Sequence, residues 1–198
     1  MEKSEREKII INAALKVFSA KGYANTRIAD IAKEAGMSYG LAYHYFDTKE
    51  KLFDIIVEDW WTGFYDALEI LKQSTSLSTK EKLVGIIRYI LKIYEKNPHQ
   101  LSIFIAEICR GFVYHNDRKG KEKFRILFSL CRDIMLEGRQ KGELRTDIHA
   151  IYLTYLFLGA IDTFLSILIL SNEKLTLGRQ KRFTDAIINV FLNGAAAG

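Results

Sequence analysis

Hydrophobic residues recur every three to four positions along most of this 198-residue chain, with polar breaks between the repeats. This period is typical of helices packed on one face, and no stretch of useful length alternates as a strand would. We therefore predict an all-α fold of about nine helices. They are expected at residues 4–21, 27–35, 38–45, 49–72, 79–96, 98–114, 121–141, 148–170 and 176–192.

Two short predicted helices, joined at Gly36, carry the most specific pattern. A tight turn between steeply crossing helices needs a residue that accepts a positive φ, and glycine does so at little cost. The second of these helices places Tyr39, Gly40, Tyr43 and His44 on the face opposite its apolar stripe. Such a face indicates a helix-turn-helix, whose second helix enters the major groove of DNA. An ordinary helical hairpin with a partly apolar surface is the alternative.

Several side chains near this turn suit contacts with DNA. Glycine lets a helix approach base edges closely, while hydroxyls, cations and exposed amides suit phosphate oxygens. The net charge of the chain is +5, but residues 1–51 hold nine Lys and Arg against seven Asp and Glu, so local positions matter more than the total. The predicted DNA contacts are Thr26, Arg27, Ser38, Tyr39, Gly40, Tyr43, His44, Tyr45 and Lys49.

The order of motifs in this region resembles the TetR family of bacterial transcriptional regulators. The motifs are Gly22-Tyr23, Thr26, Ile31 to Gly36, Ser38 to Gly40, Tyr43 to Phe46, and Lys49 to Phe53. The specific resemblance covers about residues 5–53, and a Lys-Gly-Glu-Leu-Arg-x-Asp turn at 141–147 is similar to one often seen before the family's last two helices. Ala42 is a departure, because the family usually has a larger aliphatic residue there.

The resemblance implies two domains. Residues 1–48 would form an N-terminal three-helix helix-turn-helix DNA-binding domain, and residues 49–198 a C-terminal helical ligand-binding and dimerisation domain. The long helix that begins near Lys49 would connect them. The implied function is a ligand-responsive regulator, in its common mode a repressor, that binds a two-fold symmetric double-stranded DNA operator.

The predicted helix at 148–170 is apolar on all sides, and Asp162 is the only charged residue between Ala150 and Leu170. Its length is enough to span a bilayer, but the aspartate, the polar Thr154, Thr163 and Ser166, and the lack of a close positive flank argue against that. A soluble protein must cover both sides of such a helix. We therefore expect a homodimer through about 148–170 and 176–192, and no membrane contact.

The resemblance also implies a small-molecule cavity in the C-terminal domain, for an apolar or amphipathic effector. The predicted lining residues are Trp61, Phe64, Tyr65, Leu68, Tyr89, Phe104, Glu107, Phe112, Phe128 and Asp162. For each aromatic residue, plain core packing is the alternative. For Glu107 and Asp162, the alternative is a salt bridge to an arginine such as Arg88, Arg110 or Arg132.

Other kinds of chemistry find little support. The four histidines are scattered without metal-ligand spacing, and neither a phosphate-binding glycine loop nor a nucleophile–base pattern is visible, so we expect no enzyme, no metal and no cofactor. Cys109 and Cys131 form no metal signature and are expected to be buried thiols, with redox sensing as the alternative. The charged start of the chain is unlike a signal peptide, so we expect a cytoplasmic protein. The two rival classes are an enzyme and a helical membrane-associated or scaffolding protein.

Overall fold

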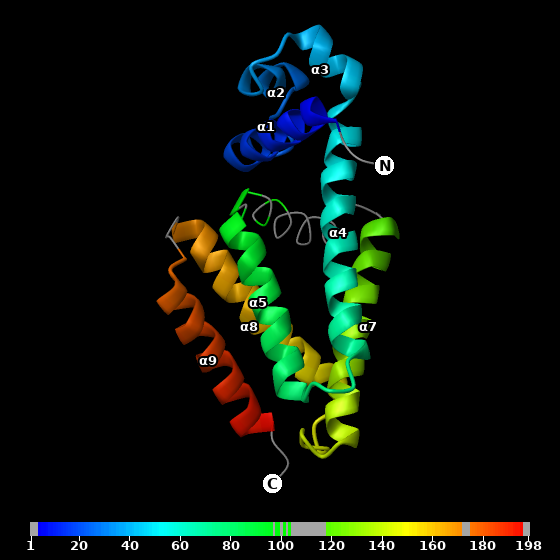
Figure 1. Cartoon of the computed structure of the whole chain (residues 1–198), viewed down its shortest axis with the longest axis vertical. Coiled ribbons are helices and arrows are strands. Elements are labelled where there is room, and N and C mark those ends of the chain that lie inside the picture. The colour runs from blue at the N-terminus through cyan, green and yellow to red at the C-terminus, as the bar shows by residue number, and fades with distance from the viewer. Residues whose placement is uncertain are drawn as a thin grey trace.

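The computed structural model describes residues 4–96, 98, 99, 101, 103, 118–171 and 175–195. These residues form eight α-helices and contain no strand. Figure 1 shows α1–α3 together at one end of an elongated molecule, and α5, α7, α8 and α9 at the other. We call these two parts the head and the body; α4 runs from one into the other.

The head consists of α1 (Glu5–Lys21), α2 (Ile28–Glu34) and α3 (Tyr39–Tyr45). A capping box opens α1: the Glu7 amide donates to the Ser4 hydroxyl, and the Ser4 amide donates to the Glu7 carboxylate. The predicted positive φ at Gly36 is confirmed, at 65°. Ile10, Phe18 and Ile31 lie at the centre of the head core, which buries the apolar faces of all three helices.

Helix α4 (Lys49–Gln73) takes part in both cores. The Thr48 hydroxyl accepts from the Lys51 amide and caps its first turn. Leu52 and Ile56 are buried in the head core, whereas Trp60, Trp61, Phe64 and Leu68 are buried in the body core. At a rise of 1.5 Å per residue, the helix is about 37 Å long. A displacement of α4 in the body therefore reaches the head directly.

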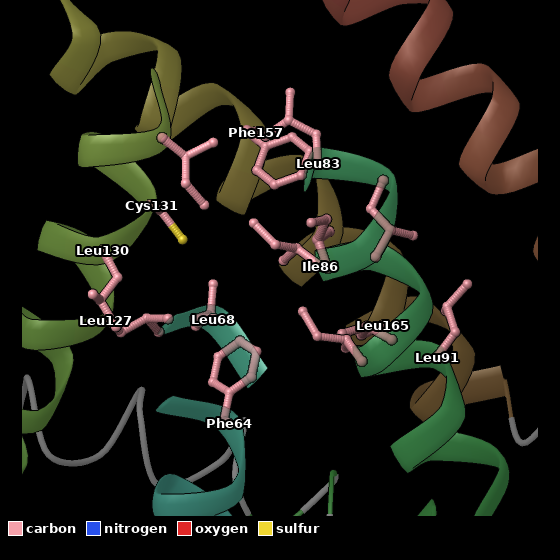
Figure 2. Packing of buried hydrophobic residues seen from close by; sticks show 14 of the residues in the cluster. Phe64, Leu68, Leu83, Ile86, Leu91, Leu127, Leu130, Cys131, Phe157 and Leu165 are labelled. Atoms are coloured by element: carbon pink, nitrogen blue, oxygen red, sulfur yellow. The ribbon is translucent and has the colours of Figure 1, made fainter. Parts of the chain in front are cut away.

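The body packs α4 against α5 (Thr79–Lys96) and α7 (Arg118–Gln140), with α8 (Ala150–Ser171) and α9 (Leu177–Ala195) completing it. Figure 2 shows side chains from four of these helices converging in its core. They are Phe64 and Leu68 of α4, Leu83, Ile86 and Leu91 of α5, Leu127, Leu130 and Cys131 of α7, and Phe157 and Leu165 of α8.

Two polar contacts fix the end of the body that lies far from the head. The Lys82 ammonium is 1% exposed; it donates to the Lys72 carbonyl (2.9 Å) and to Glu137 Oε2 (2.7 Å). The Glu143 carboxylate accepts from the Thr79 amide at the start of α5. These bonds tie together the C-terminal end of α4, the first turn of α5 and the last turns of α7.

The outer side of α8 carries exposed apolar residues. Tyr152, Leu156, Ile167 and Leu170 are 53–84% exposed in the single chain. By length and composition α8 is apolar enough to cross a membrane, and 33% of the apolar stretch is buried inside the chain. A single helix of this kind does not by itself indicate a membrane protein, because helices covered by a second subunit have the same composition.

The observed bounds agree with the predicted helices to within three residues. The N-cap of α2 is Arg27, not Thr26. Asp147 does not cap α8, which begins at Ala150, and instead pairs with Arg145. The predicted helix at 98–114 lies largely outside the described residues, although Ile103 is buried in the head core and His99 Nδ1 lies 2.9 Å from the Ser19 hydroxyl of α1.

Candidate DNA-binding face and effector-binding body

The N-cap Ser38, whose hydroxyl accepts from the Leu41 amide, fixes the start of α3 and hence the direction of its outer face. Tyr39 is 55% exposed and Tyr43 48% exposed, and their ring centroids lie 5.8 Å apart. Gly40 and His44 are also exposed, and a Cβ built on Gly40 has no neighbouring atom within 4 Å. The outer face of α3 is therefore aromatic and polar, with an open notch at Gly40.

Most cations of the head are already paired. Lys16 pairs with Glu34 (3.2 Å), and Lys21 pairs with Asp30 (2.8 Å), which locks α1 onto α2. The hydrogen bond from Lys21 lowers the pKa of Asp30, so this pair stays ionised at neutral pH. Lys51 pairs with Asp47.

Two exposed cations stay open to an outside partner. Arg27 and Lys33 form no ion pair with any residue that the structure describes. Arg27 is the N-cap of α2, and Lys33 lies in its last turn, next to the turn that leads to α3. Sequence reasoning had included Arg27 among the DNA contacts but not Lys33.

Three predicted DNA contacts have other partners inside the protein. Thr26 is 2% exposed and its hydroxyl donates to the Gly22 carbonyl (2.8 Å), so the structure does not support a contact with DNA. Tyr45 is half-buried against the head core. The Lys49 ammonium donates to three backbone carbonyls and leaves no N–H group for a phosphate in this conformation.

Five of the predicted effector residues come together where α4 meets α5. Trp61, Phe64 and Leu68 are buried in the body core, and Tyr65 and Tyr89 are half-buried against it. The Trp61 and Tyr65 rings stack with centroids 5.3 Å apart, and the Phe64 and Tyr89 rings stack at 5.7 Å. Trp60, which was not among the predicted lining residues, joins them with its ring 5.1 Å from that of Trp61. We call these six residues the α4 aromatic cluster.

The cluster is tied to α7 through one residue. The Tyr65 hydroxyl donates to the Lys123 carbonyl (2.5 Å), and the Lys123 ammonium pairs with Glu58 of α4. Burial raises the pKa of the Tyr65 hydroxyl, and the nearby Glu58 and Glu122 carboxylates raise it further, so it stays a neutral donor.

Two other predicted effector residues lie elsewhere. Phe128 packs against the exposed Tyr155 of α8, with ring centroids 4.8 Å apart. Asp162 is exposed on the outer side of α8. It forms no ion pair with Arg88, Arg132 or any other residue that the structure describes. An all-apolar helix does not reveal which side faces its own core, so the sequence could not show on which side Asp162 lies. Phe104, Glu107 and Phe112 lie outside the described residues, as do Cys109 and Arg110.

Cys131 is fully buried in the body core. Burial raises the pKa of its thiol to about 12, so it carries almost no thiolate at neutral pH, and the buried-thiol interpretation holds. No group of His, Cys, Asp and Glu among the described residues could hold a metal ion.

Comparison with known proteins identifies the chain. Residues 10–56, which form the head and the first turns of α4, match the model of the bacterial regulatory proteins of the tetR family. The head is a tetR-family DNA-binding domain. Members of this family are DNA-binding transcriptional regulators and act as dimers, so the exposed face of α3 belongs to a DNA-binding helix-turn-helix.

The likeness to tetR-family regulators extends over the whole chain. A fatty acid metabolism regulator protein of Bacillus subtilis is 26% identical over 187 residues, which cover 93% of each chain. The transcriptional repressor NicS of Pseudomonas putida is 28% identical over 156 residues, covering 78% of this chain and 73% of its own. The structure of the ketosteroid regulator KstR2 of Mycobacterium tuberculosis matches all of this chain and 98% of its own with a TM-score of 0.84, at 18% identity, which shows the shared fold.

Proposed function

We propose that this tetR-family regulator is a homodimeric repressor that leaves its operator when a small apolar or amphipathic molecule binds its body. The observation that carries the proposal is the placement of α4. One helix holds the head core with Leu52 and Ile56 and the α4 aromatic cluster with residues 60–68. An event in the cluster thus acts on the same rigid element that positions the DNA-binding face.

DNA recognition is assigned to the exposed residues of α2 and α3. Tyr39 and the notch at Gly40 read base edges in the major groove, while Arg27, Ser38, Tyr43 and His44 contact the DNA backbone and fix the register. Lys33 joins this set because it is exposed and unpaired among the described residues. Two such faces in a dimer must reach successive major grooves, about 34 Å apart, so the operator is two-fold symmetric.

Effector action is assigned to the α4 aromatic cluster. Its aromatic side chains fill the space between α4 and α5, so a ligand entering there must part the two helices or move α4 along α7. Either motion changes the distance between the two α3 helices of a dimer. A ligand that prefers the displaced form by about 1–3 kcal/mol weakens operator binding roughly 5- to 150-fold.

The division of the chain at residue 48 and the sites in both parts remain predictions. The regulator is proposed to work in the cytoplasm, where its DNA is, without catalysis and without a cofactor. Its relatives are regulators, not enzymes, which supports this assignment.

The first test is selection of bound fragments from the source genome, followed by titration of the selected duplex and of a shuffled duplex of equal length. The expected result is a two-fold symmetric sequence bound at least 1,000-fold more tightly than the shuffled one, as is typical of specific regulators. Equal affinity for both duplexes at moderate salt would contradict the proposal.

The second test is a titration of the protein–operator complex with effectors. The relative named as a fatty acid metabolism regulator makes long-chain acyl compounds a rational first panel: stearoyl-coenzyme A, stearate and coenzyme A. We expect an active compound to release the operator from the wild type, and to act only at higher concentration on a Trp61→Ala variant that still binds DNA. A compound that binds the body but leaves operator affinity unchanged counts against effector control.

A further inference from the structure

The side chain of Lys49 is enclosed by the turn that connects α1 to α2. Its Nζ lies 3.0 Å from the Tyr23 carbonyl oxygen, 3.1 Å from that of Ala24 and 3.1 Å from that of Thr26. An ammonium group has three N–H donors, so every donor has an acceptor within the protein. To reach a phosphate, Lys49 would have to give up at least one of these bonds.

Aromatic and acidic side chains surround the same contact. The Lys49 ammonium lies 4.7 Å from the centroid of the Tyr23 ring, a cation–π distance. The Tyr23 hydroxyl donates to Glu50 Oε1 (3.0 Å), and the Tyr23 ring packs on Phe18 of α1 and Phe53 of α4. The first turn of α4 is thus attached to the turn at residues 23–26 by both its polar and its apolar side chains. We call this set of contacts the Lys49 junction.

The turn at residues 23–26 leads directly into the DNA-binding face. Thr26 is anchored to Gly22, and the next residue is Arg27, the exposed N-cap of α2. The Arg27 amide donates to Asp30, which in turn pairs with Lys21 of α1. A shift of the turn relative to α4 therefore moves Arg27 and α2, and through the α2–α3 turn it moves the outer face of α3.

We infer that Lys49 is a positioning residue for DNA binding: its ammonium holds the turn at residues 23–26 against α4 and so fixes the position of α3. This inference rests on the proposed function, because it concerns the orientation of the same DNA-binding face. It assigns Lys49 to the inside of the protein and leaves the contacts with DNA phosphates to other cations such as Arg27 and Lys33.

Arginine does not substitute for lysine in this arrangement. A guanidinium keeps the positive charge, but its donors lie in one rigid plane and suit the two oxygens of a carboxylate or phosphate. The three carbonyls around Lys49 converge on a single point, which suits the compact ammonium group. The Lys49→Arg variant thus separates a role of charge towards DNA from a role of geometry within the protein.

The experiment compares Lys49→Arg and Lys49→Met with Lys51→Met in the full-length protein. Lys51 is the matched control because it lies on the same turn of α4, is 65% exposed and bonds to no carbonyl. Operator affinity is measured against salt concentration, at a temperature at which circular dichroism shows each variant fully folded. Amide hydrogen exchange of residues 22–27 is measured without DNA.

Both Lys49 variants are expected to bind the operator at least tenfold more weakly than the wild type at every salt concentration, with an unchanged salt slope. Their amides at residues 22–27 should exchange faster, while those of α8 and α9 and those of Lys51→Met remain as in the wild type. The inference is overturned if Lys49→Arg binds like the wild type while Lys49→Met loses about one unit of salt slope, which is the signature of a phosphate contact. Unchanged exchange in both variants overturns it as well.

Failure of the proposed function gives a different result. In that case the wild type and Lys51→Met would also show no preference for the selected operator. The exchange measurement would still report on the Lys49 junction, because it requires no DNA.

Discussion

Gly40 lowers the stability of the folded protein. In a helix interior, glycine costs about 1 kcal/mol relative to alanine, because it loses more backbone entropy on folding. Nothing within the described structure requires a glycine here, since an added Cβ meets no atom within 4 Å and its φ is not in the left-handed region. We expect a close approach of DNA to the outer face of α3, as proposed above, to be the reason for a glycine at this position.

Replacing Gly40 by Ala is accordingly expected to have opposite effects on folding and binding. The free energy of unfolding should rise by about 0.5–1 kcal/mol, because the new methyl group lies in open space. Operator affinity should fall about tenfold or more, because that methyl group occupies the position of a base edge. Urea unfolding and operator titration of the same protein give both quantities, and a variant that binds the operator as tightly as the wild type excludes a close approach at Gly40.

At the scale of helices, the end of α4 far from DNA is held by a buried charge. Lys82 donates to Glu137 and to the Lys72 carbonyl, and Glu137 also accepts from Lys141 (2.6 Å). Burial favours the neutral acid, but the hydrogen bonds from Lys141 and Lys82 outweigh it and lower the pKa of Glu137. These bonds fix the C-terminal end of α4 to α5 and α7.

The Glu137→Gln substitution leaves the Lys82 ammonium buried without a counter-charge. We expect the free energy of unfolding to fall by about 3 kcal/mol at neutral pH, in chemical denaturation at fixed protein concentration. The Lys82→Met change in the same chain should recover part of this loss, because it removes the stranded charge. A double variant less stable than Glu137→Gln alone would contradict this account.

The same pair predicts a dependence on pH. A carboxyl group whose pKa is lowered in the folded state stabilises that state above its unfolded pKa, near 4.5, and this contribution is lost as the pH falls through the folded value. The stability difference between the wild type and Glu137→Gln should therefore shrink as the solution is made more acidic than pH 4.5.

Sequence patterns located the helices well wherever the signal is local. Ser4, Ser38 and Thr48 cap helices through amides three residues away, and Gly36 turns the chain within one residue. The exposure of Tyr39, Gly40, Tyr43 and His44 follows from the helical period and is confirmed, while their contacts with DNA stay a prediction. Local spacing alone is enough for features of this kind.

Contacts between distant residues could not be predicted in this way. The partners of Lys49 lie 23–26 residues before it, and Glu137 lies 55 residues after Lys82. Nothing in the sequence shows that either lysine bonds inside the protein, because only the folded chain brings acceptors to them. The apolar pattern of α8 likewise does not distinguish its inner side from its outer side, so the exposure of Asp162 could not be predicted.

For the whole molecule, the outer side of α8 is where a second subunit is expected. Gly159, Ala160 and Thr163 are exposed at its middle, and small residues of this kind let two helices approach closely. Asp162 lies beside them, and partial burial already raises the pKa of its carboxyl group in the single chain. Dimer formation would remove more water from the same group and raise its pKa further.

Dimerisation should consequently weaken with rising pH. A carboxyl group whose pKa is higher in the dimer than in the folded monomer stabilises the dimer below the monomer value, and this contribution is lost as the pH rises through the dimer value. We expect Asp162→Asn to lower the dimer dissociation constant roughly tenfold at neutral pH and to remove the pH dependence. Analytical ultracentrifugation measures both, and a variant dimer weaker than the wild type would point to a cation of the second subunit as the partner of Asp162.

The sharing of α4 between two cores has a practical consequence for chimeric regulators. Consider the head of this protein fused to the effector-binding body of another regulator. With the fusion point at residue 48, the chimera would lose Leu52, Ile56 and the whole Lys49 junction. A fusion point after Val57 keeps these residues and joins the two proteins within one continuous helix, without a change in helical register. Whether such a chimera folds and binds DNA should therefore depend on a difference of a few residues in the position of the fusion point within α4.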